Sequence, residues 1–314
     1  MTDITLNSTQ LSSGAQMHQR REKKVRRLLL APSLLTILII GVLPLSVVLI
    51  YSFLEPGSYG GVKWHFSVDA YVQLLFEADI FDGTLSFTTA YLEIFWRSIS
   101  LAVMATVGCL LVGFPTAYFI ATQPPERRNI WLFLITIPFW TNLLIRTYAM
   151  LLILRDEGVI NIGLQNIGVI DQALPLLYTE FAVSLGLIYS FLPFMVLPIY
   201  SSMEKFDFRL VEAGFDLYAN RLKVLWRIIV PIAKPGIAAG CILVFIPSLG
   251  AYITPEVLGG GKSMMIGNLI HAQFGGARNW PFGAAIALIL MAVVLISLWV
   301  YMRRTGEKGG LSHG

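Results

Sequence analysis

Charged residues are scarce in this sequence. Asp, Glu, Lys and Arg make up 13% of its 314 residues, whereas hydrophobic residues make up 56% and the mean hydropathy is +0.70. Soluble domains carry charge on about a quarter of their residues, so this composition excludes an ordinary soluble domain. It predicts a chain that faces lipid, and the length suits one domain of several membrane-spanning helices.

Metal ligands and catalytic groups are also few. The two cysteines, Cys109 and Cys241, lie inside apolar stretches, and the four histidines are scattered along the chain. These spacings exclude a disulfide framework and predict no metal site. No nucleophile is accompanied by a base in an arrangement typical of a hydrolase. We therefore expect no catalytic residue and no enzymatic activity in this chain.

A nucleotide-binding loop is missing as well. The Walker pattern G-x-x-x-x-G-K-[ST] does not occur, and Gly259–Ser263, which looks like part of it, follows no strand. Any ATP that this protein uses must therefore be bound by another chain, and we expect no cofactor in this one.

Long apolar stretches are what the sequence does contain. Six are long enough to cross the hydrocarbon layer, which takes about 20 helical residues. Backbone groups in lipid must be paired within the segment, and no stretch alternates as a barrel strand does, so we expect α-helices. The predicted spans are Leu28–Phe53, Phe95–Thr122, Ile130–Leu154, Phe181–Met203, Ile232–Leu258 and Phe282–Met302.

This pattern predicts an all-α membrane protein, a bundle of six transmembrane helices. The first span is too long for a signal-peptide core, and no cleavage site follows it. We divide the chain into a basic tail at residues 1–27, a transmembrane domain at residues 28–302 and a short tail at residues 303–314. The transmembrane domain includes a polar loop at residues 204–231.

Lysine and arginine are distributed unevenly among the loops. With six spans, both termini and the even-numbered loops lie on one side, and that side holds most of the 23 basic residues. Basic residues favour the cytoplasmic side, so both termini and the loop at residues 204–231 are predicted to be cytoplasmic. The other loops carry mostly acids, which are either simply tolerated there or create a weak attractive field for a cationic solute.

Prolines recur inside the predicted spans, and each removes a backbone donor and tends to kink its helix. Two interpretations stay open: ordinary bundle packing, or kinks at Pro138, Pro193 and Pro247 that shape a cavity. Small residues also recur at intervals of four, which predicts close helix packing. They are Ala105, Cys109, Gly113, Ala117 and Ala121 in the second span and Gly236 and Gly240 in the fifth.

The polar loop at residues 204–231 separates the fourth and fifth spans. Its apolar residues recur at helical spacing among charged ones, which predicts two short amphipathic helices. Such a helix at the membrane face can dock into a groove on a partner. A structureless connection of this length would be uncommon.

Two segments of this loop, Glu212–Gly214 and Ile228–Pro231, resemble the EAA motif of ABC importer permeases. The resemblance implies that the loop is the dock for a cytoplasmic ATPase. The residues that it assigns to this coupling are Glu212, Ala213, Gly214, Asp216 and Pro231.

Two positions depart from the pattern of that family. Gly214 stands where alanine is usual, and Tyr218 stands where glycine is usual. Glycine at position 218 would suit a sharp turn between the two short helices, because glycine tolerates positive φ without strain. Either Tyr218 makes the turn at some energetic cost, or the turn shifts to Asn220, which also tolerates positive φ.

Membrane stretches extend the resemblance to the spermidine/putrescine importer permeases. They are Ile137–Leu151, Phe191–Asp207, Ile246–Gly260 and the segment from Met265 to Ala285. The resemblance implies a type I ABC importer permease fold in a bacterial inner membrane. It also implies two partner ATPase subunits that bind ATP and Mg²⁺, a second and homologous permease subunit, and a periplasmic solute-binding protein. We expect no nucleic-acid partner.

Polar side chains interrupt several spans, and some could line a path for the solute. Hydroxyl groups and aromatic faces attract an alkylammonium group, and a cation–π contact contributes about 0.5–2 kcal/mol. The candidate path residues are Trp140, Asn142, Tyr189, Ser248 and Tyr252.

Arg146 lies within the third predicted span. A basic residue at mid-helix costs about 2.5–3.5 kcal/mol on insertion scales, so it must face protein or water. An arginine is an odd lining for a cation path. We therefore expect a structural or gating ion pair, with Glu256 or with Asp156, rather than direct binding of the solute.

These observations favour the permease subunit of an ATP-driven, binding-protein-dependent importer of polyamines. One alternative is an ABC importer permease for another small solute, such as an opine, an amino-acid-like compound or another organic cation. A second is a stand-alone secondary carrier or channel, which would need acidic residues deep inside its spans, and the predicted spans contain none there. A scaffold without transport activity would leave the polar third and fifth spans unexplained.

Overall fold

Helices dominate the structure, a computed structural model that describes residues 30–33, 35–78, 85–204 and 206–309. Within these residues, five helices are long and apolar enough to cross a membrane, or up to six if a bent pair counts as one span. The predicted tail at residues 1–27 lies outside the described residues. The five unbroken helices cover Leu30–Tyr51, Ala90–Ala121, Glu180–Met203, Arg221–Leu249 and Trp280–Trp299.

The third predicted span, Ile130–Leu154, is not one helix. It contains most of α5 (Pro125–Trp140) and α6 (Leu143–Leu154), and α6 is followed by α7 (Val159–Asn166). The segment Leu143–Asn166, which holds α6 and α7, is bent by 91° relative to α5. Pro138 lies in the last turn of α5 and removes a backbone donor there. The Oδ1 atom of Asn142 then accepts a hydrogen bond from the Leu144 amide at 2.8 Å and caps the new helix.

The fifth predicted span, Ile232–Leu258, begins and ends earlier than expected. A continuous helix runs through α10 (Arg221–Val224), the π-helical turn η2 (Leu225–Ile229) and α11 (Val230–Leu249). It stops two residues after Pro247, and α12 (Ile253–Gly259) forms a separate short helix. The prediction was wrong here because hydropathy records apolar composition and not the direction of the backbone.

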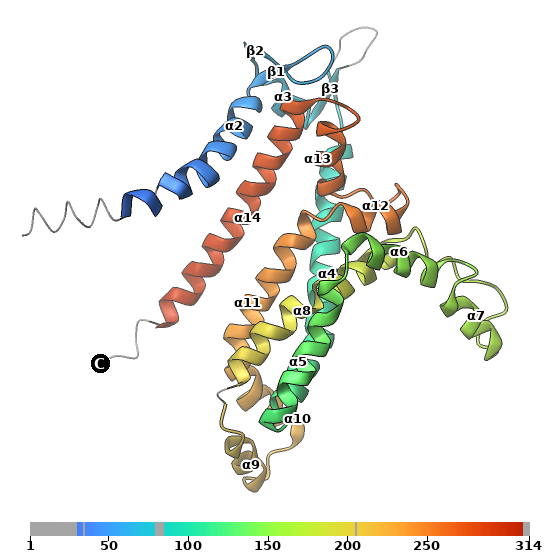
Figure 1. Cartoon of the computed structure of the whole chain (residues 1–314), viewed down its shortest axis with the longest axis vertical. Helices are drawn as coiled ribbons and strands as arrows, with labels where there is room; N and C mark the ends of the chain where they lie inside the picture. Colours follow the sequence, from blue (N-terminus) through green and yellow to red (C-terminus); the bar gives the residue numbers. More distant parts are fainter. Residues whose placement is uncertain (1–29, 34, 79–84, 205, 310–314) are drawn as a thin grey trace, which may run out of the picture.

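α4 (Ala90–Ala121), α8 (Glu180–Met203) and α11 pack side by side and form the core (Figure 1). The small residues predicted to permit close packing are buried in it. A Cβ atom at Gly236 would lie 2.3 Å from the Pro198 carbonyl oxygen, and one at Gly240 would lie 2.8 Å from Sδ of Met195. Only glycine lets these two helices approach so closely.

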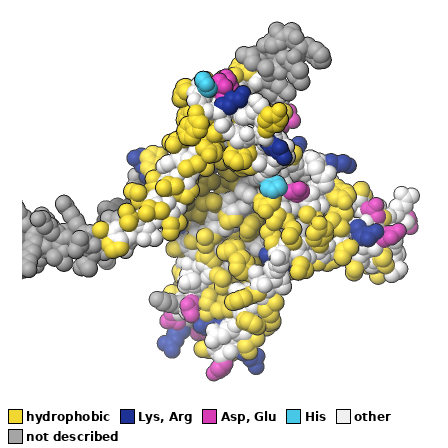
Figure 2. Space-filling view, turned by 45° about the horizontal axis from the view of Figure 1, so that its top comes forward, with side chains coloured by type: hydrophobic (Ala, Val, Ile, Leu, Met, Phe, Trp, Pro, Cys, Tyr) yellow, Lys and Arg dark blue, Asp and Glu magenta, His cyan; other side chains and the backbone are white. Residues whose placement is uncertain are grey.

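The first helix contains the π-helical turn η1 (Leu38–Val42) and α2 (Leu43–Tyr51), and it pairs with α14 (Trp280–Gly309). The rings of Tyr51 and Trp280 stack with centroids 6.3 Å apart. α14 continues into residues 303–309, which the sequence placed in a C-terminal tail. Charged side chains gather at the extremities of the face shown in Figure 2, and hydrophobic side chains cover its middle.

The connection between α2 and α4 adds two small antiparallel sheets that an all-α prediction did not include. β1 (Leu54–Pro56) pairs with β2 (Val62–Phe66), and β3 (Phe76–Ala78) pairs with β4 (Leu85–Phe87). The short helices α3 (Asp69–Val72) and α13 (Ile266–Phe274) lie at the same end (Figure 1). We call this the hairpin end of the molecule.

Candidate functional site

The polar loop folds as an elbow at the opposite end of the molecule from the hairpins (Figure 1). We define the elbow as residues 206–231. Its first helix, α9 (Arg209–Asp216), is separate, as predicted. The second predicted helix is instead the beginning of the continuous helix Arg221–Leu249, so the elbow joins one membrane helix directly.

Tyr218 makes the sharp turn between α9 and α10. Its φ angle is 58°, in the left-handed region, whereas Asn220 has a φ of −74°. Asn220 begins α10 by accepting a hydrogen bond from the Lys223 amide at 2.8 Å. Of the two possibilities left open by the sequence, the turn at Tyr218 is therefore the one that the structure adopts.

α9 has an inner and an outer face. Val211 and Gly214 are buried, and a Cβ atom at Gly214 would lie 3.0 Å from Cδ1 of Ile228 and 3.3 Å from Cγ2 of Val224. Glycine in place of the usual alanine thus brings α9 close to the helix that continues into the membrane.

The outer face of the elbow carries most of the predicted coupling residues. Glu212, Ala213, Asp216 and Pro231 are all exposed, whereas Gly214 supports the elbow from inside. Exposed residues can contact a partner chain, and a buried one can act only by positioning them.

A cavity of about 470 Å³ lies between the two helix breaks and α8. The breaks follow Pro138 and Pro247, in agreement with the interpretation that kinks there shape a cavity, whereas α8 is one helix through Pro193. The lining residues are Phe139, Thr141, Leu143, Arg146, Ser190, Phe191 and residues 250–254.

The structure brings few of the predicted path residues into this cavity. Tyr252 lines it and stacks on His271 with ring centroids 4.9 Å apart. Ser248 is fully buried, and its hydroxyl donates to the Val244 carbonyl at 2.7 Å. Asn142 is used as a helix cap.

Trp140 and Tyr189, the other two predicted path residues, are 81% and 40% exposed and are not among the lining residues. Thr254, whose hydroxyl the sequence also offered to the solute, does line the cavity, whereas the hydroxyls of Thr141 and Ser190 were missed. Thr141 lies at the first helix break, so Pro138 was the signal that could have found it.

Arg146 faces the cavity without the predicted ion pair. Its Nε and Nη1 atoms are buried and have no hydrogen-bond partner. Glu256 lines a different cavity of about 210 Å³ beside His271, and Asp156 is exposed. The expected pairing was wrong for the described residues of this chain, because Arg146 on α6 and Glu256 on α12 line separate cavities.

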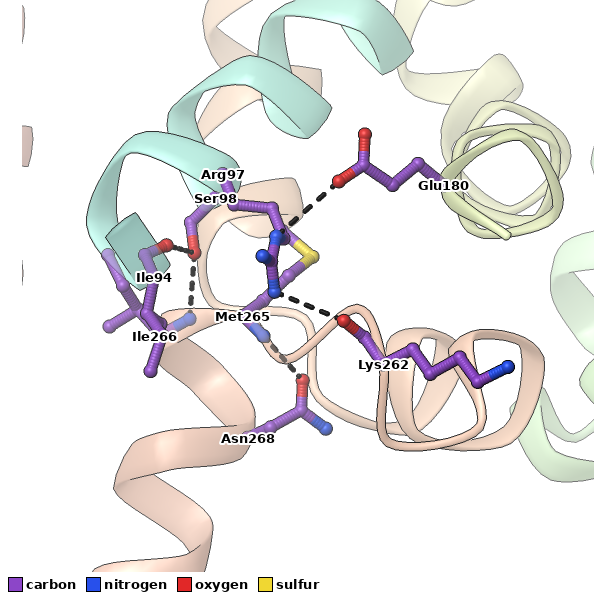
Figure 3. Close-up of polar contacts among 8 residues, drawn as sticks. All are labelled: Ile94, Arg97, Ser98, Glu180, Lys262, Met265, Ile266 and Asn268. Carbon is purple, nitrogen blue, oxygen red and sulfur yellow. Dashed lines mark hydrogen bonds and ion pairs between the residues drawn. The ribbon is translucent and has the colours of Figure 1, made fainter. Parts of the chain in front are cut away.

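Arg97, which falls inside the predicted second span Phe95–Thr122, does make an ion pair. Its Nε atom lies 3.4 Å from Oε1 of Glu180, and its Nη1 atom donates to the Lys262 carbonyl at 3.1 Å (Figure 3). These contacts tie α4 to the beginning of α8 and to the connection between α12 and α13.

Ser98 and Asn268 complete this polar cluster. The Ser98 hydroxyl donates to the Ile94 carbonyl at 2.7 Å and accepts from the Ile266 amide at 2.8 Å (Figure 3). Nδ2 of Asn268 donates to the Tyr252 carbonyl at 2.7 Å. The cluster therefore fixes the backbone at one wall of the cavity, next to the α11–α12 break.

Comparison with known proteins places this architecture in a family. The model of the family "Binding-protein-dependent transport system inner membrane component" matches residues 110–304. The spermidine/putrescine transport system permease protein PotB of Escherichia coli K12 is 41% identical over 261 residues, which cover 83% of this chain and 90% of that protein. PotB of Haemophilus influenzae is 42% identical over 228 residues, 73% of this chain and 80% of that protein.

Solved structures agree on the fold. A bacterial ABC transporter that imports the acidic polysaccharide alginate contains a chain with a TM-score of 0.64 and 16% identity, covering 92% of this chain and 98% of that one. The alginate transporter in complex with its pentasaccharide-bound periplasmic protein gives a TM-score of 0.65 at 18% identity, with coverage of 92% and 97%. The chain therefore belongs to the binding-protein-dependent inner membrane components, the multi-pass and non-catalytic permease subunits of ABC importers.

Proposed function

We propose that this chain is a permease subunit of an ATP-driven importer of polyamines such as spermidine and putrescine. The observation that carries the proposal is the 41% identity to PotB, a spermidine/putrescine permease, over 83% of this chain. A periplasmic binding protein would deliver the solute at the hairpin end, and a second permease would complete the path.

The elbow would face the cytoplasm and dock an ATPase subunit that holds ATP and Mg²⁺. The excess of basic residues at this end supports that orientation. The path of α14 supports it too, because this helix runs from the hairpin end towards the elbow end and carries Arg303 and Arg304 near its C-terminus (Figure 1). We assign the polar contacts with the ATPase to Glu212 and Asp216, which are exposed on α9.

The continuous helix Arg221–Leu249 gives a physical route from the elbow to the cavity. It begins three residues after the turn at Tyr218 and ends at Leu249, next to Gly250, which lines the cavity. A displacement of the elbow by the ATPase would therefore reach the cavity wall along one continuous helix. The rest of the path has only to accommodate that movement.

The cavity offers an alkylammonium group only brief contact. Tyr252 and Phe191 supply aromatic faces, and Ser190 and Thr254 supply hydroxyl oxygens. Arg146, also in the lining, is a cation, and none of the described lining residues is a carboxylate. Without a carboxylate, contact with a polyamine is weak, as a path that must release its solute requires. Tight binding would belong to the periplasmic binding protein.

Uptake by the reconstituted transporter tests this proposal. Proteoliposomes containing this permease, its second permease and the ATPase are given binding protein loaded with labelled spermidine or putrescine. We expect uptake that needs internal ATP and persists when the proton gradient is collapsed. Uptake that follows the proton gradient and ignores ATP would contradict the proposal, and unlabelled opines or amino acids that abolish polyamine uptake would redirect it to another solute.

A further inference from the structure

Tyr218 is the most exposed large hydrophobic side chain at the elbow. It is 99% exposed, and the neighbouring Leu217 is 81% exposed. Neither side chain is covered by this chain, although the inner face of α9 is packed against the helix behind it. An apolar ring presented to solvent in this way is typical of an anchor residue in a protein interface.

The backbone at Tyr218 is held in an unfavourable conformation. Its φ angle of 58° is strained for any residue with a Cβ atom, and least so for asparagine and aspartate after glycine. A glycine would make the same turn without this cost. The chain therefore combines a strained turn with an exposed ring that does not pack against the rest of the described structure.

The surrounding hydrogen bonds fix the backbone from which the ring projects. The Tyr218 amide donates to the Phe215 carbonyl at 2.9 Å, and the Ala219 amide donates to the Gly214 carbonyl at 3.1 Å. Asn220 fixes the start of the next helix two residues later. Because the backbone of this turn is already ordered, it loses little conformational entropy when a partner binds, and this favours binding.

We propose that Tyr218 is an anchor that inserts its ring into an apolar socket on the ATPase subunit. The inference rests on the proposed function and adds the residue that carries most of the contact. A protein socket is favoured over the membrane surface because α9, which leads into the turn, exposes two carboxylates, Glu212 and Asp216, against a single base, Arg209. The net negative charge of α9 disfavours its contact with an anionic cytoplasmic leaflet, which would attract only the bases beyond the turn.

Charged residues around the ring would form the polar rim of such an interface. Asp216 lies on one side of the turn, and Arg221 and Lys223 lie on the other, all of them exposed. An apolar centre within a polar rim is the usual anatomy of a protein–protein contact.

Binding of the purified ATPase to the permease pair in nanodiscs tests the proposal. Y218N removes the ring and keeps a residue that tolerates the turn, whereas Y218F keeps the ring and removes only the hydroxyl. We expect Y218N to weaken ATPase binding at least tenfold without lowering the melting temperature, and Y218F to bind within about twofold of the unmodified protein. The matched control is Y59N, because Tyr59 is 93% exposed at the hairpin end and should not affect ATPase binding.

Parallel measurements separate the possible failures. Unchanged binding by Y218N, with weakened binding by E212R, would overturn the role of Tyr218 and leave the proposed function standing. If the ATPase does not bind the unmodified pair, the proposed function itself fails. A loss of affinity for Y218N in nanodiscs but not in detergent micelles would assign the ring to the membrane surface and overturn the proposal.

Discussion

The guanidinium of Arg146 has no intramolecular partner for two of its buried nitrogens. An unpaired buried donor costs about 1–3 kcal/mol, and more when it is charged. The second permease subunit could supply an acceptor in the assembled transporter, whereas a cationic solute could not. The two unpaired nitrogens in the single chain therefore point to a role in the assembly and not to folding.

Replacing Arg146 with methionine, R146M, tests this account. Methionine has a similar length and fills irregular space. We expect the free energy of unfolding of the isolated permease to rise by about 1–3 kcal/mol, because the unpaired donors disappear. Denaturant titration in mixed micelles measures this change, and uptake by the assembled transporter is expected to fall.

R146K is the matched control, since it keeps the charge and should give no such gain in stability. A methionine variant that unfolds more readily than the unmodified chain would show that the guanidinium has a stabilising partner within the permease.

Among the elements, the contact between α8 and α11 depends on glycine. A Cβ atom at Gly236 would lie 2.3 Å from one backbone atom of α8, and backbone cannot move aside as a side chain can. We expect G236A to destabilise the permease by about 1–3 kcal/mol, the usual cost of overpacking. Thermal unfolding of the isolated chain in detergent measures it.

G163A is the control for that variant. Gly163 lies inside α7, and a Cβ atom there would meet nothing within 4 Å. Alanine should stabilise this exposed helix slightly, by about 0.5–1 kcal/mol. Equal effects of the two substitutions would mean that close packing of α8 and α11 does not depend on Gly236.

Sequence patterns predicted which segments form helices better than they predicted where those helices break and in which direction they run. Apolar composition located the five unbroken spanning helices, because the number of apolar residues needed to cross a bilayer is fixed by its thickness. The 91° bend after Trp140 could not be detected from hydropathy, because the residues on both sides of the bend are apolar. The two hairpins escaped prediction because their strands are only three to five residues long, too short for alternation to stand out.

The site was predicted where it depends on local sequence and was missed where it depends on tertiary contact. The elbow followed from helical spacing and from the motif around Glu212. The pairing of Arg146 was wrong and that of Arg97 with Glu180 was not foreseen, because each depends on where separate helices end. Arg97 and Glu180 are separated by 82 residues, which give no local signal of their contact.

For the whole molecule, the proposed orientation predicts which end reacts from which side of the membrane. In a background without Cys109 and Cys241, we expect E212C to react with an impermeant maleimide only in inverted vesicles. Y59C should react only in intact spheroplasts, because Tyr59 lies at the hairpin end and is exposed. The reverse labelling pattern would contradict the orientation and, with it, the assignment of the elbow to the ATPase.

The unbroken helix from Arg221 to Leu249 has 29 residues and is therefore about 43 Å long. If it pivots near its elbow end as a rigid lever, a tilt of about 10° displaces the other end by about 7 Å, more than one helical turn. Such a swing is comparable to the width of a cavity of about 470 Å³. Access to the path could thus alternate between the two membrane faces without any membrane helix unwinding.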